Sequence, residues 1–316
     1  MPPQYLDRER IAALLPMDAC IPVMEQAFRS LAAGNTLQPL RSLMWLPDKS
    51  GILGMMPGYA KNPDILGIKV ITIFHANGAL GLSSHQGVVM LFDAKQGTPL
   101  LMLDAAEITA IRTAATSALA TRLLARKDAS HLAILGTGEQ AERHIQAISL
   151  VRQIDRITIW GRNNAHAETL ARKFKNTQIA PTAKEAINDA DIICTVTASP
   201  EPILYGDWLP EGVHINAVGS CTPTTRELDT AAVLRSRLFT DRYESLFHEA
   251  GEFLIPKKEG LLTESDTQAE LGEILTGTKE GRKNASEITL FKSLGIAAED
   301  LFSAHYVFEK LQSIIS

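Results

Sequence analysis

Three cationic side chains within the first 112 residues lie in or close to apolar stretches. Lys69 falls within Gly67-Ile68-Lys69-Val70-Ile71, and Arg112 falls within Ile111-Arg112-Thr113-Ala114-Ala115. Arg41 is also set close to apolar sequence. Burying a cation is unfavourable unless it meets an anion. An anionic ligand is one explanation for these residues, and internal carboxylate partners or side chains that extend to solvent are the ordinary ones.

A glycine-rich turn provides a second chemical signal. Gly136-Thr137-Gly138-Glu139-Gln140-Ala141 follows a short apolar strand and opens a helical stretch. This is the G-x-G-x-x-A form of the dinucleotide fingerprint, in which the glycines allow a tight turn and close approach of backbone N–H groups to a pyrophosphate. A glycine-rich turn without a ligand is the plainer alternative. The position between strand and helix favours dinucleotide binding by Gly136, Thr137, Gly138, Glu139 and Gln140.

The end of the next strand bears on which dinucleotide is bound. NAD-dependent enzymes usually place Asp or Glu there to bond the ribose 2′-hydroxyl. This chain has Trp160-Gly161-Arg162-Asn163 instead. A guanidinium can bind a 2′-phosphate through charge-assisted hydrogen bonds. We therefore predict NADPH as the cofactor, with NADH possible and with Arg162 and Asn163 at the site; the alternative is that Arg162 points to solvent.

The elements that must position these residues fall into two parts. The first part mixes helix and strand, and its consecutive strands at hairpin-like spacing predict a largely antiparallel sheet. A long helix over 104–126 follows, and the polar stretch 127–130 predicts the joint between domains. The expected helix in the first part is 18–33, the expected strands are 42–46, 65–74 and 87–92, and the expected turns are Pro57-Gly58, Asn62-Pro63 and Asn77-Gly78.

The second part alternates strand and helix, which is typical of a parallel sheet covered on both faces. The fold class predicted is α/β, with a Rossmann-type parallel-sheet domain at 127–301. An α+β domain at 1–126 would be completed by a C-terminal helix at about 302–316, because 287–315 has a helical pattern. The expected strands are 131–135, 156–160, 191–196, 213–218 and 238–240, and the expected helices are 139–150 and 165–174.

Composition excludes several classes of protein. Lys and Arg number 31 against 36 Asp and Glu, so there is no basic excess for nucleic acid, and no apolar run approaches the roughly 18 residues of a membrane helix. Cys20, Cys194 and Cys221 are far apart, which argues against disulfides or structural zinc and favours the cytoplasm. The segment 248–252 lacks the second histidine of a zinc-protease helix, so no metal is predicted.

The order of short motifs resembles the ornithine cyclodeaminase/μ-crystallin family over nearly the whole chain. Each motif alone is modest evidence, but together and in this order they are specific. Besides the stretches around Arg112 and Gly136, they are Gly54-Met55-Met56-Pro57, Gly81-Leu82-Ser83-Ser84-His85-Gln86-Gly87, Asn216-Ala217-Val218-Gly219-Ser220, Arg226-Glu227-Leu228-Asp229 and Phe291-Lys292-Ser293-Leu294-Gly295.

The resemblance implies a homodimer that pairs through the first domain, with the active site in the cleft between the two domains. It implies that Arg41, Lys69 and Arg112 hold a substrate α-carboxylate. The residues that it places near the cofactor are Ser84, His85, Arg112 and Thr113 on the substrate side and Thr197, Val218, Ser220 and Ser293 at the nicotinamide end.

Two departures from the family pattern bear on the reaction. The cyclodeaminases have Asp where this chain has Cys221, and Glu where it has Gly54. Their reaction needs a carboxylate that moves protons. We therefore predict the simpler reduction of a cyclic ketimine carboxylate, Δ1-pyrroline-2-carboxylate or its six-membered piperideine analogue, to L-proline or L-pipecolate. A small space-filling role for Cys221 is favoured over that of a thiol acid.

Proton delivery and the competing functions remain open at this stage. Lys69 is a candidate proton donor if Arg41 and Arg112 lower its pKa. His85 is a second candidate, or a loop histidine that only packs on the cofactor. The competing functions are cyclodeamination or amino-acid dehydrogenation on the same fold, and non-catalytic binding of the kind known for μ-crystallins.

Overall fold

The computed structural model describes residues 3–83 and 85–315, which form two compact units. Unit 1 comprises Met1–Arg112 and Gly295–Ser316, and unit 2 comprises Thr113–Leu294. The expected boundaries at 126/127 and about 302 are therefore displaced. The first falls inside helix α3 (Ala105–Leu124), because the early turns of α3 bond to unit 1 through Glu107 and Arg112 while Thr121 bonds to unit 2.

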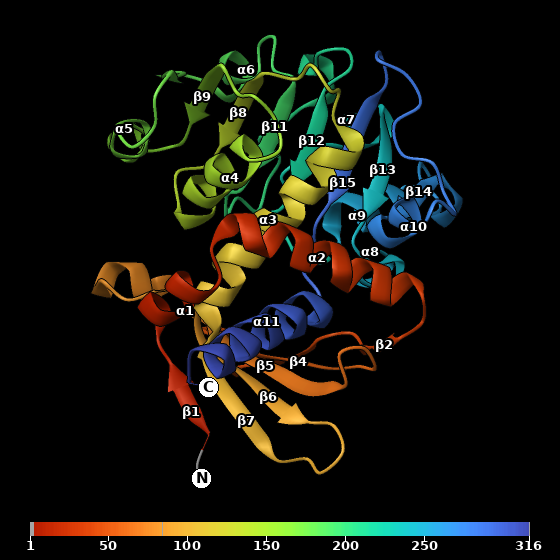
Figure 1. Ribbon diagram of the computed structural model, residues 1–316. Helices are drawn as coiled ribbons and strands as arrows, with labels where there is room; N and C mark the ends of the chain where they lie inside the picture. Colours follow the sequence, from red (N-terminus) through yellow and green to blue (C-terminus); the bar gives the residue numbers. More distant parts are fainter. Residues whose placement is uncertain (1–2, 84, 316) are drawn as a thin grey trace. The chain divides into compact units, whose positions relative to one another are not determined.

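Unit 1 is built on a seven-stranded sheet with the order β1-β7-β6-β5-β4-β2, with β3 also paired to β4 (Figure 1). Only β1 and β7 are parallel, so the expectation of a largely antiparallel sheet is confirmed. The strands are β1 (Gln4–Leu6), β2 (Thr36–Leu37), β3 (Ser42–Trp45), β4 (Ile52–Ala60), β5 (Ile65–Ile73), β6 (His85–Asp93) and β7 (Pro99–Asp104); the helices are α1 (Arg8–Leu14), α2 (Met17–Ala32), the short 3-10 helix His75–Leu80 and α11 (Ala297–Ile315).

Strand β4 corrects one expected turn. Pro57-Gly58 lies inside β4 and does not end a strand. On one side β4 pairs with β5 along its whole length, and on the other side β3 covers Ile52–Met55 and β2 covers Tyr59–Ala60. Pro57 falls in the interval between β3 and β2, an edge position where the missing N–H of proline is tolerated.

Helix α11 covers the sheet of unit 1, and α2 packs on α11. The apolar stripe expected for 18–33 is buried in α2, at Ile21, Met24, Phe28 and Leu31. Helix α11 packs on α2 and on strands β4, β5 and β6. Strand β5 requires glycine at Gly67, because a Cβ there would lie 2.7 Å from the Met90 carbonyl oxygen of β6. The same Cβ would be in ordinary contact with Leu301 of α11, at 3.4 Å from its Cγ.

Unit 2 is built on an eight-stranded sheet with the order β10-β9-β8-β11-β12-β15-β13-β14, and its pairings are all parallel. The chain reverses its direction of travel across the sheet between β8 and β11, which is where open parallel sheets bind ligands. The predicted α/β Rossmann-type fold is thus confirmed. The strands are β8 (His131–Leu135), β9 (Arg156–Trp160), β10 (Thr177–Ile179), β11 (Ile192–Thr195), β12 (His214–Ala217), β13 (Ser236–Thr240), β14 (Thr267–Glu270) and β15 (Ile288–Lys292).

Helices surround this sheet, and the two predicted over 139–150 and 165–174 are present with slightly earlier ends. They are α4 (Glu139–Ser149), α5 (Asn164–Ala171), α6 (Ala183–Ala186), α7 (Thr230–Leu234), α8 (Tyr243–Glu249), α9 (Gly251–Lys258) and α10 (Leu271–Thr276), with 3-10 helices at Gly206–Trp208 and Glu264–Asp266.

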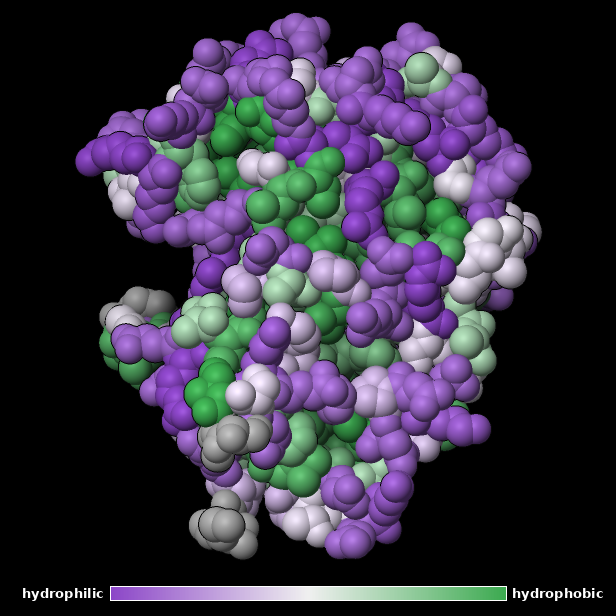
Figure 2. All heavy atoms as spheres, in the orientation of Figure 1, coloured by the Kyte–Doolittle hydropathy of each residue, from purple (hydrophilic) through white to green (hydrophobic). Residues whose placement is uncertain are grey.

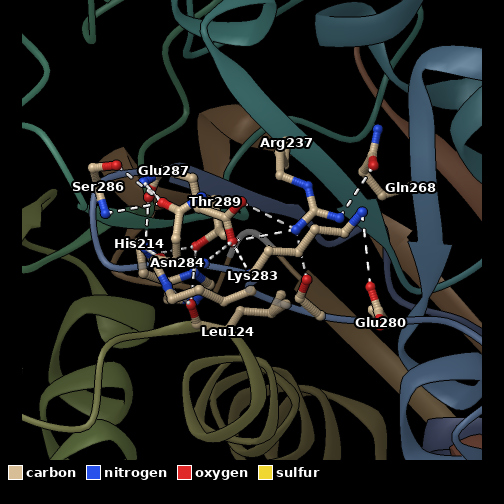
Figure 3. Close-up of polar contacts among 12 residues, drawn as sticks. Leu124, His214, Arg237, Gln268, Glu280, Lys283, Asn284, Ser286, Glu287 and Thr289 are labelled. Atoms are coloured by element: carbon tan, nitrogen blue, oxygen red, sulfur yellow. Dashed lines mark hydrogen bonds and ion pairs between the residues drawn. The ribbon is translucent and has the colours of Figure 1, made fainter.

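The helix expected over 287–315 is wrong in its first part, which forms strand β15. Residues 288–292 are fully buried between β12 and β13, and only α11 is helical. Side-chain hydrogen bonds hold the turn before β15 (Figure 3): the Glu287 carboxylate accepts from Arg237 Nη1 at 3.2 Å, and Asn284 Oδ1 accepts from Glu287 N at 2.9 Å. A short apolar run has no periodicity that separates a buried strand from a helix.

Figure 2 shows one face of the molecule, with polar side chains along the margins of each unit and apolar side chains visible toward its middle. Within residues 3–83 and 85–315, no single helix is long and apolar enough to cross a membrane, and α1 and α2 reach that length and composition only as a pair bent by 79°.

Candidate active site

Lys69 lies in the middle of β5, opposite Met56 of β4 and Val89 of β6. Its neighbours in the sheet leave the residue only 2% exposed. The Nζ atom lies 2.7 Å from Asp300 Oδ2 and 3.5 Å from the Thr109 hydroxyl. The apolar pattern around Lys69 therefore does mark a buried cation, and a carboxylate faces it.

Arg112 is joined to the same carboxylate. Its Nε donates to Asp300 Oδ1 at 3.0 Å, and its Nη1 donates to Glu299 Oε2 at 2.7 Å. Glu299 and Asp300 lie in the first turn of α11, where the helix dipole favours negative charge. Asp300 thus bridges Lys69 and Arg112.

Arg41 reaches the same region of unit 1 through Gly295. Its Nη2 donates to the Gly295 carbonyl oxygen at 2.8 Å. Gly295 has φ +72°, and a Cβ there would lie 2.5 Å from Arg112 Nη1. Glycine is therefore required at this position both by the backbone conformation and by the guanidinium packed against it.

The cluster formed by Arg41, Lys69, Arg112, Glu299 and Asp300 has three cationic groups and two carboxylates. Burial lowers the pKa of Lys69 to about 8; Asp300 opposes this shift, and the positive charges of Arg112 and Arg41 add to it. The internal carboxylates that stood as the alternative explanation are present for Lys69 and Arg112. When all five groups are ionised, the cluster has a formal net charge of +1.

The other residues expected on the substrate side are placed differently. His85 begins β6, is exposed, and lies four residues, or about 13 Å of strand, from Val89, the residue opposite Lys69. The structure does not bring it to the cluster. Thr113 is buried on α3, next in the chain to Arg112. Ser84 lies outside the described residues.

The glycine-rich turn of unit 2 joins β8 to α4 as expected. Gly136 has φ +136°, and a Cβ there would lie 2.7 Å from the Val196 carbonyl oxygen. A Cβ on Gly138 would meet no described atom within 4 Å, and Gly138 has no side chain to cap α4. The first turn of α4 can therefore offer N–H groups to an anion, which fits a pyrophosphate. Gln140 is half-buried, with its Oε1 atom unpartnered among the described residues.

The second strand end lies beside this turn. Gly136 N donates to the Trp160 carbonyl oxygen at 2.8 Å, and a Cβ on Gly161 would lie 2.5 Å from the Thr137 methyl carbon. Arg162 follows and is exposed. Asn163 caps α5, because its side-chain oxygen accepts from Ala165 N at 3.0 Å. Asn163 thus has a structural role as the N-cap of α5, whereas the sequence predicted a cofactor contact for it.

Three further strands carry the residues expected at the nicotinamide end. Thr197 follows β11, Val218 and Ser220 follow β12, and Ser293 follows β15. These strands are neighbours in the sheet, so the carboxyl ends bring the four residues to one edge. Ser220 Oγ donates to the Thr225 carbonyl oxygen at 2.7 Å, and Thr197 Oγ1 donates to Glu227 at 2.7 Å.

The two positions that differ from the cyclodeaminases have different surroundings, apolar at Gly54 and near the Lys292 ammonium at Cys221. A Cβ on Gly54 would lie 3.4 Å from methyl carbons of both Ile71 and Leu43. Cys221 is half-buried, with its sulfur 3.7 Å from the Val218 carbonyl oxygen.

Sequence reasoning missed four acidic residues. Glu299 and Asp300 pair with the cations of unit 1, and Glu227 and Glu252 are buried in unit 2. Glu227 lies inside a motif that carried the family resemblance, Glu299 and Asp300 lie just after another, and Glu252 lies far from any of them. No spacing rule joins these residues to their partners. The sequence does hold a local signal for Glu299 and Asp300: two adjacent carboxylates lie in the first turn of a helix, beginning four residues after Gly295.

Known proteins show similarity over the whole chain. The family model described as the ornithine cyclodeaminase/mu-crystallin family matches residues 3–314. A Δ1-pyrroline-2-carboxylate reductase of Bacillus cereus is 37% identical over 303 residues, 94% of this chain and 93% of that protein. The ketimine reductase mu-crystallin of Mus musculus is 35% identical over 316 residues, 98% of each chain.

A solved structure gives the same result. The Δ1-pyrroline-2-carboxylate reductase of Thermococcus litoralis, in complex with NADH and L-proline, superposes with a TM-score of 0.96 at 36% identity and covers 98% of both chains. The expected resemblance is confirmed: this chain belongs to the ornithine cyclodeaminase/mu-crystallin family.

Proposed function

We propose that the protein reduces a cyclic ketimine carboxylate, Δ1-pyrroline-2-carboxylate or Δ1-piperideine-2-carboxylate, to L-proline or L-pipecolate with NADPH. The observation that carries the proposal is the cluster around Lys69, a buried lysine with a pKa of about 8 beside Arg112 and Arg41. The names of the relatives support a nicotinamide-dependent oxidoreductase that acts on a C=N bond.

Substrate binding rests on the excess charge of the cluster. Glu299 and Asp300 pair with Arg112 and Lys69, and the five groups together carry a formal charge of +1, which suits a monoanionic substrate. The carboxylates engage Nε and Nη1 of Arg112, and Nη2 carries two further N–H donors. A substrate carboxylate would accept from these donors and from Arg41. Asp300 then orients Arg112 and Lys69, while Nη2 of Arg112 is left to bind the substrate carboxylate.

Proton delivery is assigned to Lys69. With a pKa of about 8, Lys69 is mostly protonated at pH 7 and can release a proton more easily than an ordinary lysine. The proton would pass from Nζ to the ring nitrogen of the imine, and the reduced nicotinamide would supply the hydride that adds to C2. The product amine keeps the proton on its nitrogen and the hydride on C2, and solvent returns a proton to Lys69.

The dinucleotide is assigned to unit 2. Gly136 and Gly138 would leave room for the pyrophosphate at the start of α4, as the open space at Gly138 suggests. Thr197, Val218, Ser220 and Ser293 would contact the nicotinamide end. His85 and Thr113 remain proposed cofactor contacts from the substrate side, and His85 is not needed as a proton donor.

NADPH preference depends on Arg162. Its exposed guanidinium follows β9, the strand end that reads the ribose in this fold. The Thermococcus litoralis relative was solved with NADH, so the preference requires a direct test. Arg162→Ala should raise the KM for NADPH about tenfold or more and leave the KM for NADH nearly unchanged. Equal effects on both would contradict the assignment.

The activity is tested by following NADPH absorbance with Δ1-pyrroline-2-carboxylate, Δ1-piperideine-2-carboxylate, ornithine and alanine plus NAD. We expect oxidation of NADPH by one or both imines. Ammonia release from ornithine would favour a cyclodeaminase, and NAD reduction by alanine would favour an amino-acid dehydrogenase. Tight NADPH binding with no turnover of any of these compounds would favour a binding protein.

A homodimer paired through unit 1 is part of the proposal. Strand β3 is an edge strand whose four residues are exposed, including Leu43 at 41%, Met44 at 52% and Trp45 at 52%. An apolar edge of this kind favours association with a partner. Light scattering should give a dimer for the native chain and a monomer for Met44→Glu. A reducing compartment such as the cytoplasm is proposed as well, because Cys20, Cys194 and Cys221 form no disulfide within the described part of the chain.

A further inference from the structure

Unit 2 contains a second buried charge cluster that the proposed reaction does not use. It consists of Glu227, Glu252 and Lys292, each no more than 1% exposed. Glu227 lies in the loop before α7, Glu252 on α9 and Lys292 at the end of β15. Such groups are costly to bury, and apolar residues of the same size often give equal or greater stability. Their arrangement therefore calls for a reason besides stability.

Glu227 ties two strand ends together. Its Oε1 accepts from the N–H and the hydroxyl of Thr197, both at 2.7 Å. Its Oε2 accepts from the Thr195 hydroxyl and from Gly219 N, also at 2.7 Å. Thr195 ends β11, and Gly219 follows β12. One carboxylate thus makes four short, charge-assisted hydrogen bonds to neighbouring segments at the carboxyl edge of the sheet.

Lys292 holds the loop after β12 from the other side. Its Nζ donates to the Ser220 carbonyl oxygen at 2.5 Å and to the Ala217 carbonyl oxygen at 3.4 Å. The same Nζ lies 3.3 Å from Glu252 Oε2, and Glu252 Oε1 accepts from the backbone N of Glu227 at 3.0 Å. The three charged residues therefore form one continuous network.

The packing at Gly219 shows how closely this network encloses the loop. A Cβ there would lie 2.1 Å from the Thr197 carbonyl oxygen and 2.6 Å from Glu227 Oε1. The N–H of Gly219 is already donated to Glu227. The loop 217–220 is consequently fixed by hydrogen bonds on both of its sides.

We infer that Glu227, Glu252 and Lys292 are positioning residues for the nicotinamide half of the bound dinucleotide. They act through Thr197 and the loop 217–220, which they hold at the carboxyl ends of β11 and β12. The adenosine half, assigned to the turn at Gly136 and to Arg162, does not depend on them. This inference rests on the proposed function, because it presupposes a dinucleotide at this edge of the sheet.

The two halves of the cofactor can be measured separately. ADP-ribose, or its 2′-phosphate, carries the adenosine half and the pyrophosphate without nicotinamide. Glu227→Gln keeps the size of the side chain but replaces one acceptor oxygen with an amide NH2 that must face an existing donor. Calorimetry should show the Kd of the full dinucleotide raised about tenfold or more. The Kd of the matching fragment should change less than about twofold.

A milder variant covers the case in which Glu227→Gln does not fold. Thr195→Val removes one of the four donors to Glu227 and preserves the shape of the strand. It should raise the Kd of the full dinucleotide severalfold and leave that of the fragment unchanged. Thr289→Val is the matched control, a buried strand threonine whose hydroxyl donates to the Leu124 carbonyl oxygen at 3.1 Å. It should change neither Kd.

The outcomes separate the inference from the proposed function. A native protein that binds neither NADPH, NADH nor the fragments would contradict the proposed function. A native protein that binds them, with Glu227→Gln and Thr195→Val either weakening both ligands equally or weakening neither, would overturn the inference alone.

Discussion

Two lysines of this chain are buried beside carboxylates, and their surroundings shift their pKa values in opposite directions. Lys69 lies on β5 in unit 1 with Asp300 at 2.7 Å, and Lys292 lies on β15 in unit 2 with Glu252 at 3.3 Å. Burial acts to lower the pKa of both side chains. The pKa of Lys69 is lowered to about 8, whereas Glu252, with Cys221 and Glu227, raises the pKa of Lys292.

The difference comes from the count of neighbouring charges. Lys69 shares one bridging carboxylate with Arg112 and is also near Arg41. Lys292 is the single cation among two carboxylates and two carbonyl oxygens. A cluster with excess positive charge can accept an anion and give up a proton, while a cluster with excess negative charge keeps its lysine charged. Burial alone therefore does not identify a reactive lysine.

The largest expected effect is on Lys69. Lys69→Met should lower kcat for imine reduction by about 10²–10⁴-fold, because the proton donor is removed. The Kd of the dinucleotide should stay close to that of the native protein, since the cofactor is assigned to unit 2. Steady-state kinetics and calorimetry measure the two quantities. Full activity at saturating imine would remove Lys69 from the mechanism.

The corresponding change in unit 2 should act on stability. Lys292→Met leaves Glu252 buried without its ammonium partner, which should cost about 3–5 kcal/mol in the free energy of unfolding. Lys69→Met should cost less, because Asp300 keeps its hydrogen bond to Arg112. Urea unfolding followed by tryptophan fluorescence measures both, and adding Glu252→Gln to Lys292→Met should recover part of the loss. A Lys292→Met protein as stable as the native chain would contradict the account of this cluster.

The sequence was sufficient to predict what short-range patterns determine. The apolar strands and the turn at Gly136 follow from residues within one β-α unit, and the stripe of α2 follows from helical periodicity. The sequence does not separate β15 from a helix, because its five residues are all buried and show no alternation. The local sequence predicts a turn at Pro57, because the gap between β2 and β3 that accommodates this proline is a property of the sheet.

The candidate site was predictable only on its cationic side. The buried cations stand out because apolar neighbours surround them in the sequence, but their partners come from far away. Arg112 and Asp300 are 188 residues apart in the sequence. In unit 2, Glu227 and Lys292 both bond to the loop 217–220, which is distant from Lys292 in the sequence. Nothing in one sequence tells which of 36 acidic residues meets which of 31 basic ones.

A smaller effect should follow from removing the carboxylate that faces Lys69. Asp300 raises the pKa of Lys69, so Asp300→Asn should lower that pKa further. Protonated Lys69 is the proposed donor, and kcat/KM in the native protein should therefore fall as pH rises through about 8. In the variant this alkaline limb should lie at lower pH. Glu107→Gln is the control, a buried carboxylate of unit 1 paired with Arg8; its limb should match the native one.

The smallest expected effect is the opposite shift. Arg41 lowers the pKa of Lys69 and is the weakest of the named influences, so Arg41→Gln should move the alkaline limb slightly upward in pH. The same change should raise the KM for the imine, because a cation near its carboxylate is lost. Arg29→Gln, at an exposed pair with Glu25, should change neither. Titration of the imine itself cannot explain a difference between variants, because it is the same for all of them. A general loosening of unit 1 would not shift the alkaline limbs of Asp300→Asn and Arg41→Gln in opposite directions. Limbs that move the same way would show that the alkaline limb does not report Lys69.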